Sequence, residues 1–172
     1  TDWKGQIKFL EVLNNLKDKD IYCFFVGDDK NSSYSKKFIR EISKKKLNKI
    51  CKVLGNLSSL DLKFFYKSCD VVISAPLKPE GFGRTISESL SMKKMILSYN
   101  YGGAKDQLSK LSHHYKIKPF DNTELKNKID NIFKMSQLEK ENFGNLAREH
   151  VINNFSKELK LKNYLNFFDN IL

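Results

Sequence analysis

Short, continuous apolar runs alternate with helical patterns along this chain, and that alternation limits the folds open to it. The apolar runs cover residues 21–26, 50–54, 70–74 and 95–98, with a weaker run near 115–117. Between them, apolar residues recur at helical spacing, and residues 122 onward are helical in pattern with breaks near Ser136 and at 153–154. Strands that alternate with helices form βαβ units, which build a parallel sheet with helices on both faces. The sequence therefore predicts a doubly wound α/β fold.

No Pro/Gly-rich linker, low-complexity segment or internal repeat divides the 172 residues, so we expect one domain over residues 1–172. In a sheet of this type, ligands bind outside the carboxyl ends of the strands. Four loops follow predicted strands and should converge on one rim, at residues 27–29, 55–57, 75–80 and 99–103.

The loop that follows the third predicted strand carries the most specific chemistry. Glu80 and Glu88 lie eight positions apart, with Gly81, Phe82 and Gly83 between them. Two glycines let backbone N–H groups approach a ligand closely, and a glycine loop that leads into a helix is a common phosphate site. Two flanking carboxylates add groups that bind hydroxyls, so the loop suggests a sugar nucleotide.

The same residues allow simpler interpretations. Thr85 and Glu88 have the spacing of a capping box, in which the glutamate would bond the backbone at the helix start. The two glycines would then only form a strand-to-helix turn. The spacing alone leaves these alternatives open.

The net charge of +11 comes mostly from lysine, because only three of the 31 basic residues are arginine. No basic run is interleaved with aromatic residues, so we expect lysine-rich solvated faces and no nucleic-acid partner. Weak attraction to an anionic membrane surface stays open.

Residues 1–4 are polar and precede no apolar stretch of signal-peptide type, and no run is long enough to span a membrane. Three cysteines in apolar segments, without metal spacing, are expected to be buried reduced thiols, which suits the cytosol.

An ordered set of segments resembles retaining glycosyltransferase family 4. Residues 79–98 resemble its donor-binding signature, a Glu-x7-Glu motif followed by a helix and a strand. Residues 3–5 resemble the end of its opening Arg…Lys-Gly segment, 25–28 its Val-Gly-Asp turn, 53–73 its Gly…Leu-Tyr…Ala-Asp block, and 101–103 its Val-Gly-Gly loop. The resemblance covers nearly the whole chain in the right order.

The resemblance implies the GT-B fold, in which two Rossmann-like domains face each other across a cleft. This chain looks like the C-terminal, donor-binding domain, and the N-terminal acceptor domain is expected outside it. The implied donor is a UDP-, GDP- or ADP-sugar, with no metal, and the implied acceptor is a glycan or a lipid-linked molecule. Bacterial cell-surface polysaccharide or lipopolysaccharide assembly is the implied setting, in the cytoplasm or on the inner face of its membrane.

The resemblance also implies roles for single residues. Glu80 and Lys4 are the catalytic candidates, Glu80 beside the transferred sugar and Lys4 beside the diphosphate. Arg84 is a second candidate for the diphosphate, although the family often has an apolar residue there. Glu88 is assigned to the ribose. Seven further residues are donor-binding candidates. Gly81, Phe82 and Gly83 are placed near the diphosphate and the sugar, and Thr85 at the helix start. Gly55, Asn56 and Leu57 are placed near the nucleobase.

Two other classes of protein share parts of this pattern. Asp28 and Asp29 after an apolar strand are typical of receiver domains, but that class needs an aspartate at the end of the third strand, and Asp70 precedes it. A nucleotide-binding domain or subunit without catalysis is the stronger alternative. His113 and His114 lack metal-ligand company and are expected to be structural or exposed.

Overall fold

The computed structural model describes residues 1–27, 29, 31–112 and 115–171, so Asp28, His113 and His114 lie outside the described residues. Its strands are β1 (Cys23–Val26), β2 (Cys51–Gly55), β3 (Val71–Ser74), β4 (Met95–Tyr99) and β5 (Lys116–Ile117). The chain opens with a 3-10 turn, η1 (Asp2–Lys4). The helices that follow are α1 (Gln6–Asn14), α2 (Ser33–Lys44), α3 (Ser59–Ser68), α4 (Arg84–Ser91), α5 (Gly103–Gln107), α6 (Asn122–Lys134), α7 (Gln137–Phe155) and α8 (Lys157–Asp169). The predicted alternation of strands and helices is confirmed.

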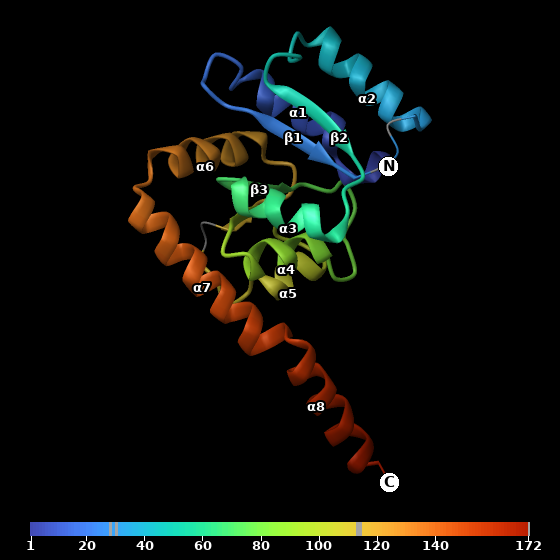
Figure 1. Cartoon of the computed structure of the whole chain (residues 1–172), viewed down its shortest axis with the longest axis vertical. Coiled ribbons are helices and arrows are strands. Elements are labelled where there is room, and N and C mark those ends of the chain that lie inside the picture. Colours follow the sequence, from blue (N-terminus) through green and yellow to red (C-terminus); the bar gives the residue numbers. More distant parts are fainter. Residues whose placement is uncertain (28, 30, 113–114, 172) are drawn as a thin grey trace.

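All strand pairs are parallel, and the predicted doubly wound α/β class is confirmed. One detail differs from the single sheet expected, because the described strands hydrogen-bond in two groups, β1–β2 and β3–β4–β5. No ladder bonds join β1 to β3 in the described part of the chain, and residues of both strands line a cavity. Figure 1 shows β1 and β2 lying together, apart from β3. Phe24 of β1 and Phe65 of α3 meet edge to face there, with ring centroids 5.7 Å apart, and their bulk lies in this opening.

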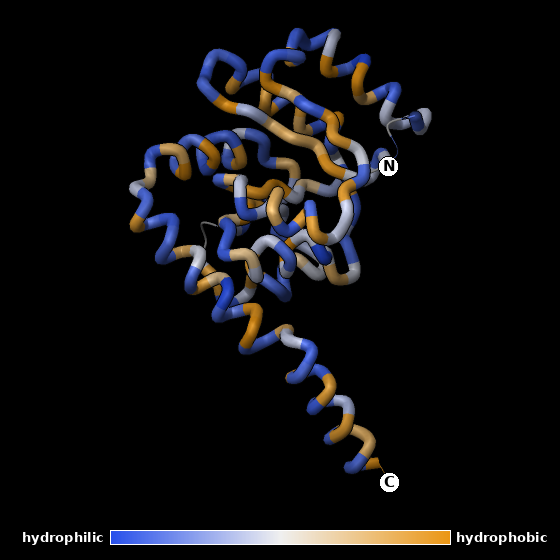
Figure 2. The backbone as a smooth tube through the Cα atoms, in the orientation of Figure 1, coloured by the Kyte–Doolittle hydropathy of each residue, from blue (hydrophilic) through white to orange (hydrophobic). Residues whose placement is uncertain are grey.

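Two apolar clusters form the core. The larger joins α1, α6 and the strands, and the smaller lies beneath α4, α5 and α7. β4 is buried along its whole length and serves both, with Leu97 in the first cluster and Ile96 in the second. Figure 2 shows the matching pattern, with apolar residues along the strands and an alternation of hydrophilic and apolar residues along the helices. α4 is thereby fixed against β3, β4 and α7, which sets the position of the loop before it.

The C-terminal helices differ from the prediction at one break. The break at Ser136 is confirmed, but the second lies at Ser156 and the predicted break at 153–154 is wrong. Asn154 stays inside α7 because its side chain donates to the carbonyl of His150, 2.8 Å away, while Ser156 caps α8 through the N–H of Leu159. α8 projects from the body of the molecule with none of its residues buried (Figure 1). Within the described residues no helix combines the length and the apolar character that a membrane crossing requires.

The cysteine thiols are free in the structure, and burial raises the pKa of each. Cys51 is buried as expected, whereas Cys23 and Cys69 are only half-buried, because both line the cavity between β1 and β3.

α7 begins with a complete capping box. The hydroxyl of Ser136 accepts from the N–H of Glu139 at 3.3 Å, and the Glu139 carboxylate accepts from the N–H of Ser136 at 2.8 Å. Ser136→Ala should therefore lower the free energy of unfolding by about 1 kcal/mol. Urea unfolding measures this, and Ser68→Ala, which removes an exposed hydroxyl at the end of α3, should change it by less than about 0.5 kcal/mol. Equal values for the two variants would contradict a stabilising capping box.

Candidate functional site

The loop between β3 and α4 rests on the loop that follows β4. The N–H of Gly103 donates to the carbonyl of Glu80 at 2.8 Å. A Cβ on Gly103 would lie 2.4 Å from the carbonyl oxygen of Gly81, and one on Gly102 would lie 2.7 Å from that of Glu80. Side chains at these positions could not fit without moving backbone. The pair of glycines therefore allows the two loops to touch, and this contact fixes the position of the Glu80 loop relative to the loop after β4.

The N–H groups of residues 81–85 form an unpaired row at the start of α4. No carbonyl or side chain among the described residues accepts from them. The N-cap of the helix is Gly83, with φ of 80° and no side-chain cap. Free donors at a helix N-terminus, where the helix dipole is positive, form a binding place for an anion. The phosphate site predicted from the glycine pattern thus has suitable donors.

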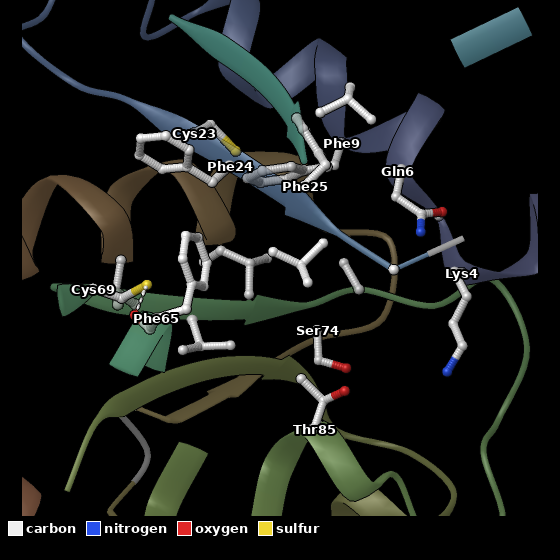
Figure 3. Close-up of a pocket in the computed structure, with 18 of the residues that line it drawn as sticks. Lys4, Gln6, Phe9, Cys23, Phe24, Phe25, Phe65, Cys69, Ser74 and Thr85 are labelled. Carbon is white, nitrogen blue, oxygen red and sulfur yellow. Dashed lines mark hydrogen bonds between the residues drawn. The ribbon is translucent and has the colours of Figure 1, made fainter. Parts of the chain in front are cut away.

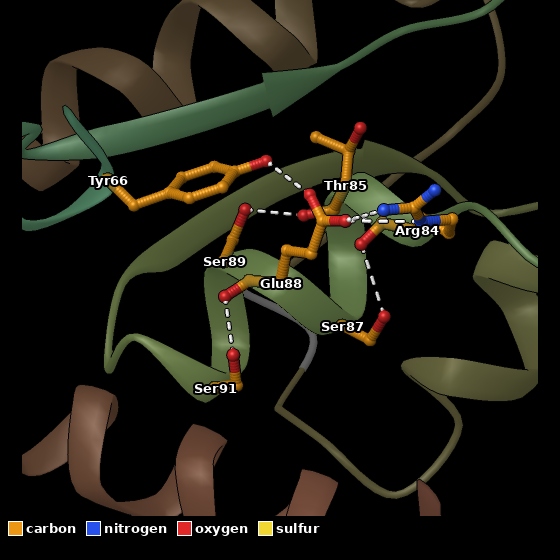
Figure 4. A network of polar contacts seen from close by, with 7 residues as sticks. All are labelled: Tyr66, Arg84, Thr85, Ser87, Glu88, Ser89 and Ser91. Atoms are coloured by element: carbon orange, nitrogen blue, oxygen red, sulfur yellow. Dashed lines mark hydrogen bonds and ion pairs between the residues drawn. The ribbon is translucent and has the colours of Figure 1, made fainter. Parts of the chain in front are cut away.

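The structure contradicts the capping interpretation of Glu88. α4 begins at Arg84, so Glu88 lies a turn into the helix, beyond the third position from which a capping glutamate reaches back. Its carboxylate instead accepts from Arg84 Nε and Nη2, at 3.2 and 3.0 Å, and from the Tyr66 hydroxyl, at 3.1 Å (Figure 4). Glu88 is therefore a partly exposed carboxylate held in place from two sides.

The opening segment of the chain forms the other side of the site. Lys4 Nζ lies 2.9 Å from a carboxylate oxygen of Glu80, whose side chain is only 16% exposed. The N–H of Leu77 donates to the carbonyl of Trp3 at 2.6 Å, and a Cβ on Gly5 would lie 2.1 Å from the carbonyl oxygen of Ala75. Lys4 and Glu80, which are 76 positions apart in the sequence, are thus held in contact.

A cavity of about 980 Å³ runs from this rim into the space between β1 and β3 (Figure 3). Six of the predicted site residues line it: Lys4, Asn56, Leu57, Glu80, Thr85 and Glu88. Figure 3 shows the hydroxyls of Ser74 and Thr85 at its lower edge and the ammonium of Lys4 to one side. Deeper walls are largely apolar and come from β1, β3 and α3.

The other predicted residues lie beside the cavity. Gly81, Phe82, Gly83, Arg84 and Gly55 are not among its lining residues. The ring of Phe82 is 45% exposed and packs edge to face on Phe155, away from the carboxylates. Arg84 is exposed and bonded to Glu88. The carbonyl of Gly55 accepts from the N–H of Gly27.

Sequence reasoning assigned no role to several residues that shape the site. Burial and the neighbouring Glu88 carboxylate raise the pKa of the Tyr66 hydroxyl, which stays protonated and donates to that carboxylate. The Tyr101 hydroxyl donates to the carbonyl of Pro76, and Gln107 contacts the Glu80 loop. The sequence could have indicated the role of Tyr66, because this tyrosine lies on a predicted helix beside the rim and a buried hydroxyl needs a hydrogen-bond partner. In the part of the chain that the structure describes, no three His, Cys, Asp or Glu side chains gather as they would around a metal.

Comparisons with known proteins identify relatives of this chain. A trehalose synthase from Pyrococcus horikoshii is 24% identical over 176 residues, which cover 98% of this chain and 41% of that protein. A glycosyltransferase from Rickettsia africae has a similar structure, with a TM-score of 0.90 and 33% identity over 99% of this chain and 45% of that one.

Anabaena HepE, solved in complex with UDP, has the same fold, with a TM-score of 0.87 and 22% identity over 99% of this chain and 46% of that one. The chain thus spans less than half the length of these relatives. These structures have the GT-B fold, and this chain corresponds to its Rossmann-like C-terminal half. The profile of the family described as glycosyl transferases group 1 matches residues 1–150, and the chain belongs to that family.

Proposed function

We propose that this chain is the donor-binding domain of a retaining glycosyltransferase of family 4. It would bind a nucleoside diphosphate sugar, and the whole enzyme would transfer the glycosyl group to a glycan or lipid-linked acceptor. The observation that carries the proposal is the row of unpaired N–H groups over residues 81–85, flanked by Glu80 with Lys4 and by Glu88.

Each part of a nucleotide sugar has a chemical counterpart in this arrangement. The diphosphate would accept from the N–H row, and Lys4 would neutralise its charge as the bond to the sugar breaks. Lys4 also fixes the carboxylate of Glu80 at 2.9 Å, where a negative charge would stabilise an oxocarbenium-like sugar.

The ribose would lie at Glu88. The two ribose hydroxyls would donate to the Glu88 carboxylate, which in the structure accepts from Arg84 and Tyr66. Arg84 would then be free to turn toward the diphosphate, as its planar fork allows. Asn56 and Leu57, which line the cavity, would contact the nucleobase.

Relatives and net charge support a particular donor and setting. HepE was solved with UDP, which supports a uridine donor over GDP- or ADP-sugars. The net charge of +11 supports peripheral contact with the inner face of an anionic membrane, where bacterial surface polysaccharide or lipopolysaccharide is assembled. A second, acceptor-binding domain outside this chain would supply the other wall of the site, since the relatives are more than twice as long.

A thermal-shift panel tests the proposal. One of UDP, GDP and ADP should raise the melting temperature of the chain, by the equivalent of about 2.7 kcal/mol at a hundredfold excess over Kd. Inorganic phosphate at the same concentration serves as the control for nonspecific anion binding and should have a much smaller effect. A panel in which no nucleoside diphosphate stabilises the chain more than phosphate does would contradict a donor site.

A further inference from the structure

Gln107, the last residue of α5, reaches beneath the Glu80 loop. Its side-chain Nε2 donates to the carbonyl of Phe82 and, at 3.3 Å, to the carbonyl of Gly83. The residue is only 1% exposed. Its other side-chain atom, Oε1, is buried and has no partner among the described residues. An unpaired buried amide oxygen costs stability, so this glutamine is better explained by what its nitrogen holds than by core packing.

These bonds fix which way the loop peptides face. Within a trans peptide, the C=O of one residue and the N–H of the next point in opposite directions, and the described chain has no cis peptides. Gln107 draws the carbonyl of Phe82 toward α5, and it shares the carbonyl of Gly83 with the N–H of Ile86, which donates at 2.9 Å. The N–H groups of Gly83 and Arg84 must therefore point away from α5, as donors for the anion.

α7 holds Gln107 from behind. His150 is buried, and its Nε2 donates to the backbone carbonyl of Gln107 at 2.6 Å. The His150 ring also packs edge to face on Phe155, and Phe155 packs in the same way on Phe82. The glutamine and the loop therefore share one support, on the side opposite the unpaired N–H row.

We propose that Gln107 is a positioning residue for the donor diphosphate: it orients the peptides of Phe82 and Gly83 so that the following N–H groups face the phosphates. The proposal rests on the proposed function, because it concerns the same site. It adds a residue that touches no part of the ligand and acts only through the backbone that does. The point where a Cβ of Gly83 would lie is 3.8 Å from Gln107 Nε2 and 3.7 Å from a Glu80 carboxylate oxygen, so the glutamine lies close behind the sugar end of the site.

Gln107→Met tests this role, because methionine has a similar length and no donor. Calorimetry measures the Kd of whichever of UDP, GDP and ADP the wild-type chain binds. This Kd should rise about tenfold, the change expected when one well-placed hydrogen bond to the phosphates is lost. The Kd of the matching nucleoside, which has no phosphate, should stay unchanged. In the ligand-free chain, ¹⁵N order parameters of residues 81–85 should fall, since the loop peptides lose their hold.

Ile132→Val provides the control. Ile132 lies on α6, buried in the larger core cluster, so this substitution should mildly lower the stability of the fold without changing any contact of the loop. It should leave both dissociation constants and the loop order parameters at wild-type values. Equal weakening of nucleoside and nucleoside diphosphate by Gln107→Met, or unchanged order parameters, would overturn the positioning role. Failure of the wild-type chain to bind any of the three nucleotides would instead overturn the proposed function.

Discussion

Glu80→Gln in the full-length enzyme is expected to lower kcat by about a hundredfold, in the range seen when one preorganised electrostatic group is removed from an active site. The Kd of the nucleoside diphosphate should change little. The reason is that Glu80 lies beside the proposed sugar position, with a side chain only 16% exposed and paired with Lys4, while the phosphates would be bound by backbone N–H groups. Steady-state kinetics and nucleotide calorimetry on the same preparation measure the two quantities.

Glu149→Gln is a suitable control, because Glu149 is an exposed carboxylate on α7, and kcat should keep its wild-type value. Parallel loss of turnover and nucleotide affinity in Glu80→Gln would mean that Glu80 is a binding residue. A full-length protein that binds nucleotide and transfers nothing would favour the alternative of a nucleotide-binding domain without catalysis.

Gly103→Ala is expected to weaken nucleoside diphosphate binding by about a hundredfold, as expected when well-placed hydrogen bonds to a charged phosphate are lost. The added Cβ would lie 2.4 Å from the carbonyl oxygen of Gly81 and 2.7 Å from the Cα of Phe82. Both neighbours are backbone, so the loop that carries the N–H row must move. Calorimetry with the nucleotide found in the thermal-shift panel measures the loss.

Gly144→Ala is the matched control for this substitution. Its Cβ would lie 2.3 Å from the carbonyl oxygen of Lys93, so the clash is as severe but falls between α7 and the turn after α4. It should lower the melting temperature while the folded protein keeps its nucleotide affinity. If Gly103→Ala bound nucleotide as tightly as Gly144→Ala, contact between the two loops would not determine the site.

The parts of the fold that depend on local pattern could be predicted from the sequence. Runs of apolar residues located the strands, and the rule that ligands bind at their carboxyl ends located the rim with Glu80 and Asn56. The separation of β1 from β3 could not be predicted, because apolar runs look alike whether or not two strands exchange hydrogen bonds. The break at Ser156 was missed since Asn154 can satisfy its amide inside a helix.

The parts of the site that depend on tertiary contacts were accessible only through the family resemblance, or not at all. Nothing local in residues 3–5 indicates that Lys4 meets Glu80. The role of Glu88 depended on whether the N-cap of α4 is Gly83 or Thr85, a shift of two residues that sequence patterns do not resolve. Gln107 gave no signal, because its importance lies in two carbonyl groups of a distant loop.

The unpaired N–H groups of residues 81–85 are expected to receive the donor diphosphate. Titration of the ¹⁵N-labelled chain with UDP, GDP and ADP, followed by two-dimensional ¹H–¹⁵N NMR, observes these groups directly. One nucleotide should shift the amide signals of residues 81–85 more than any others, and the matching nucleoside should shift them far less. Binding that leaves these amide signals unshifted, with the largest shifts elsewhere in the chain, would contradict a diphosphate site at residues 81–85.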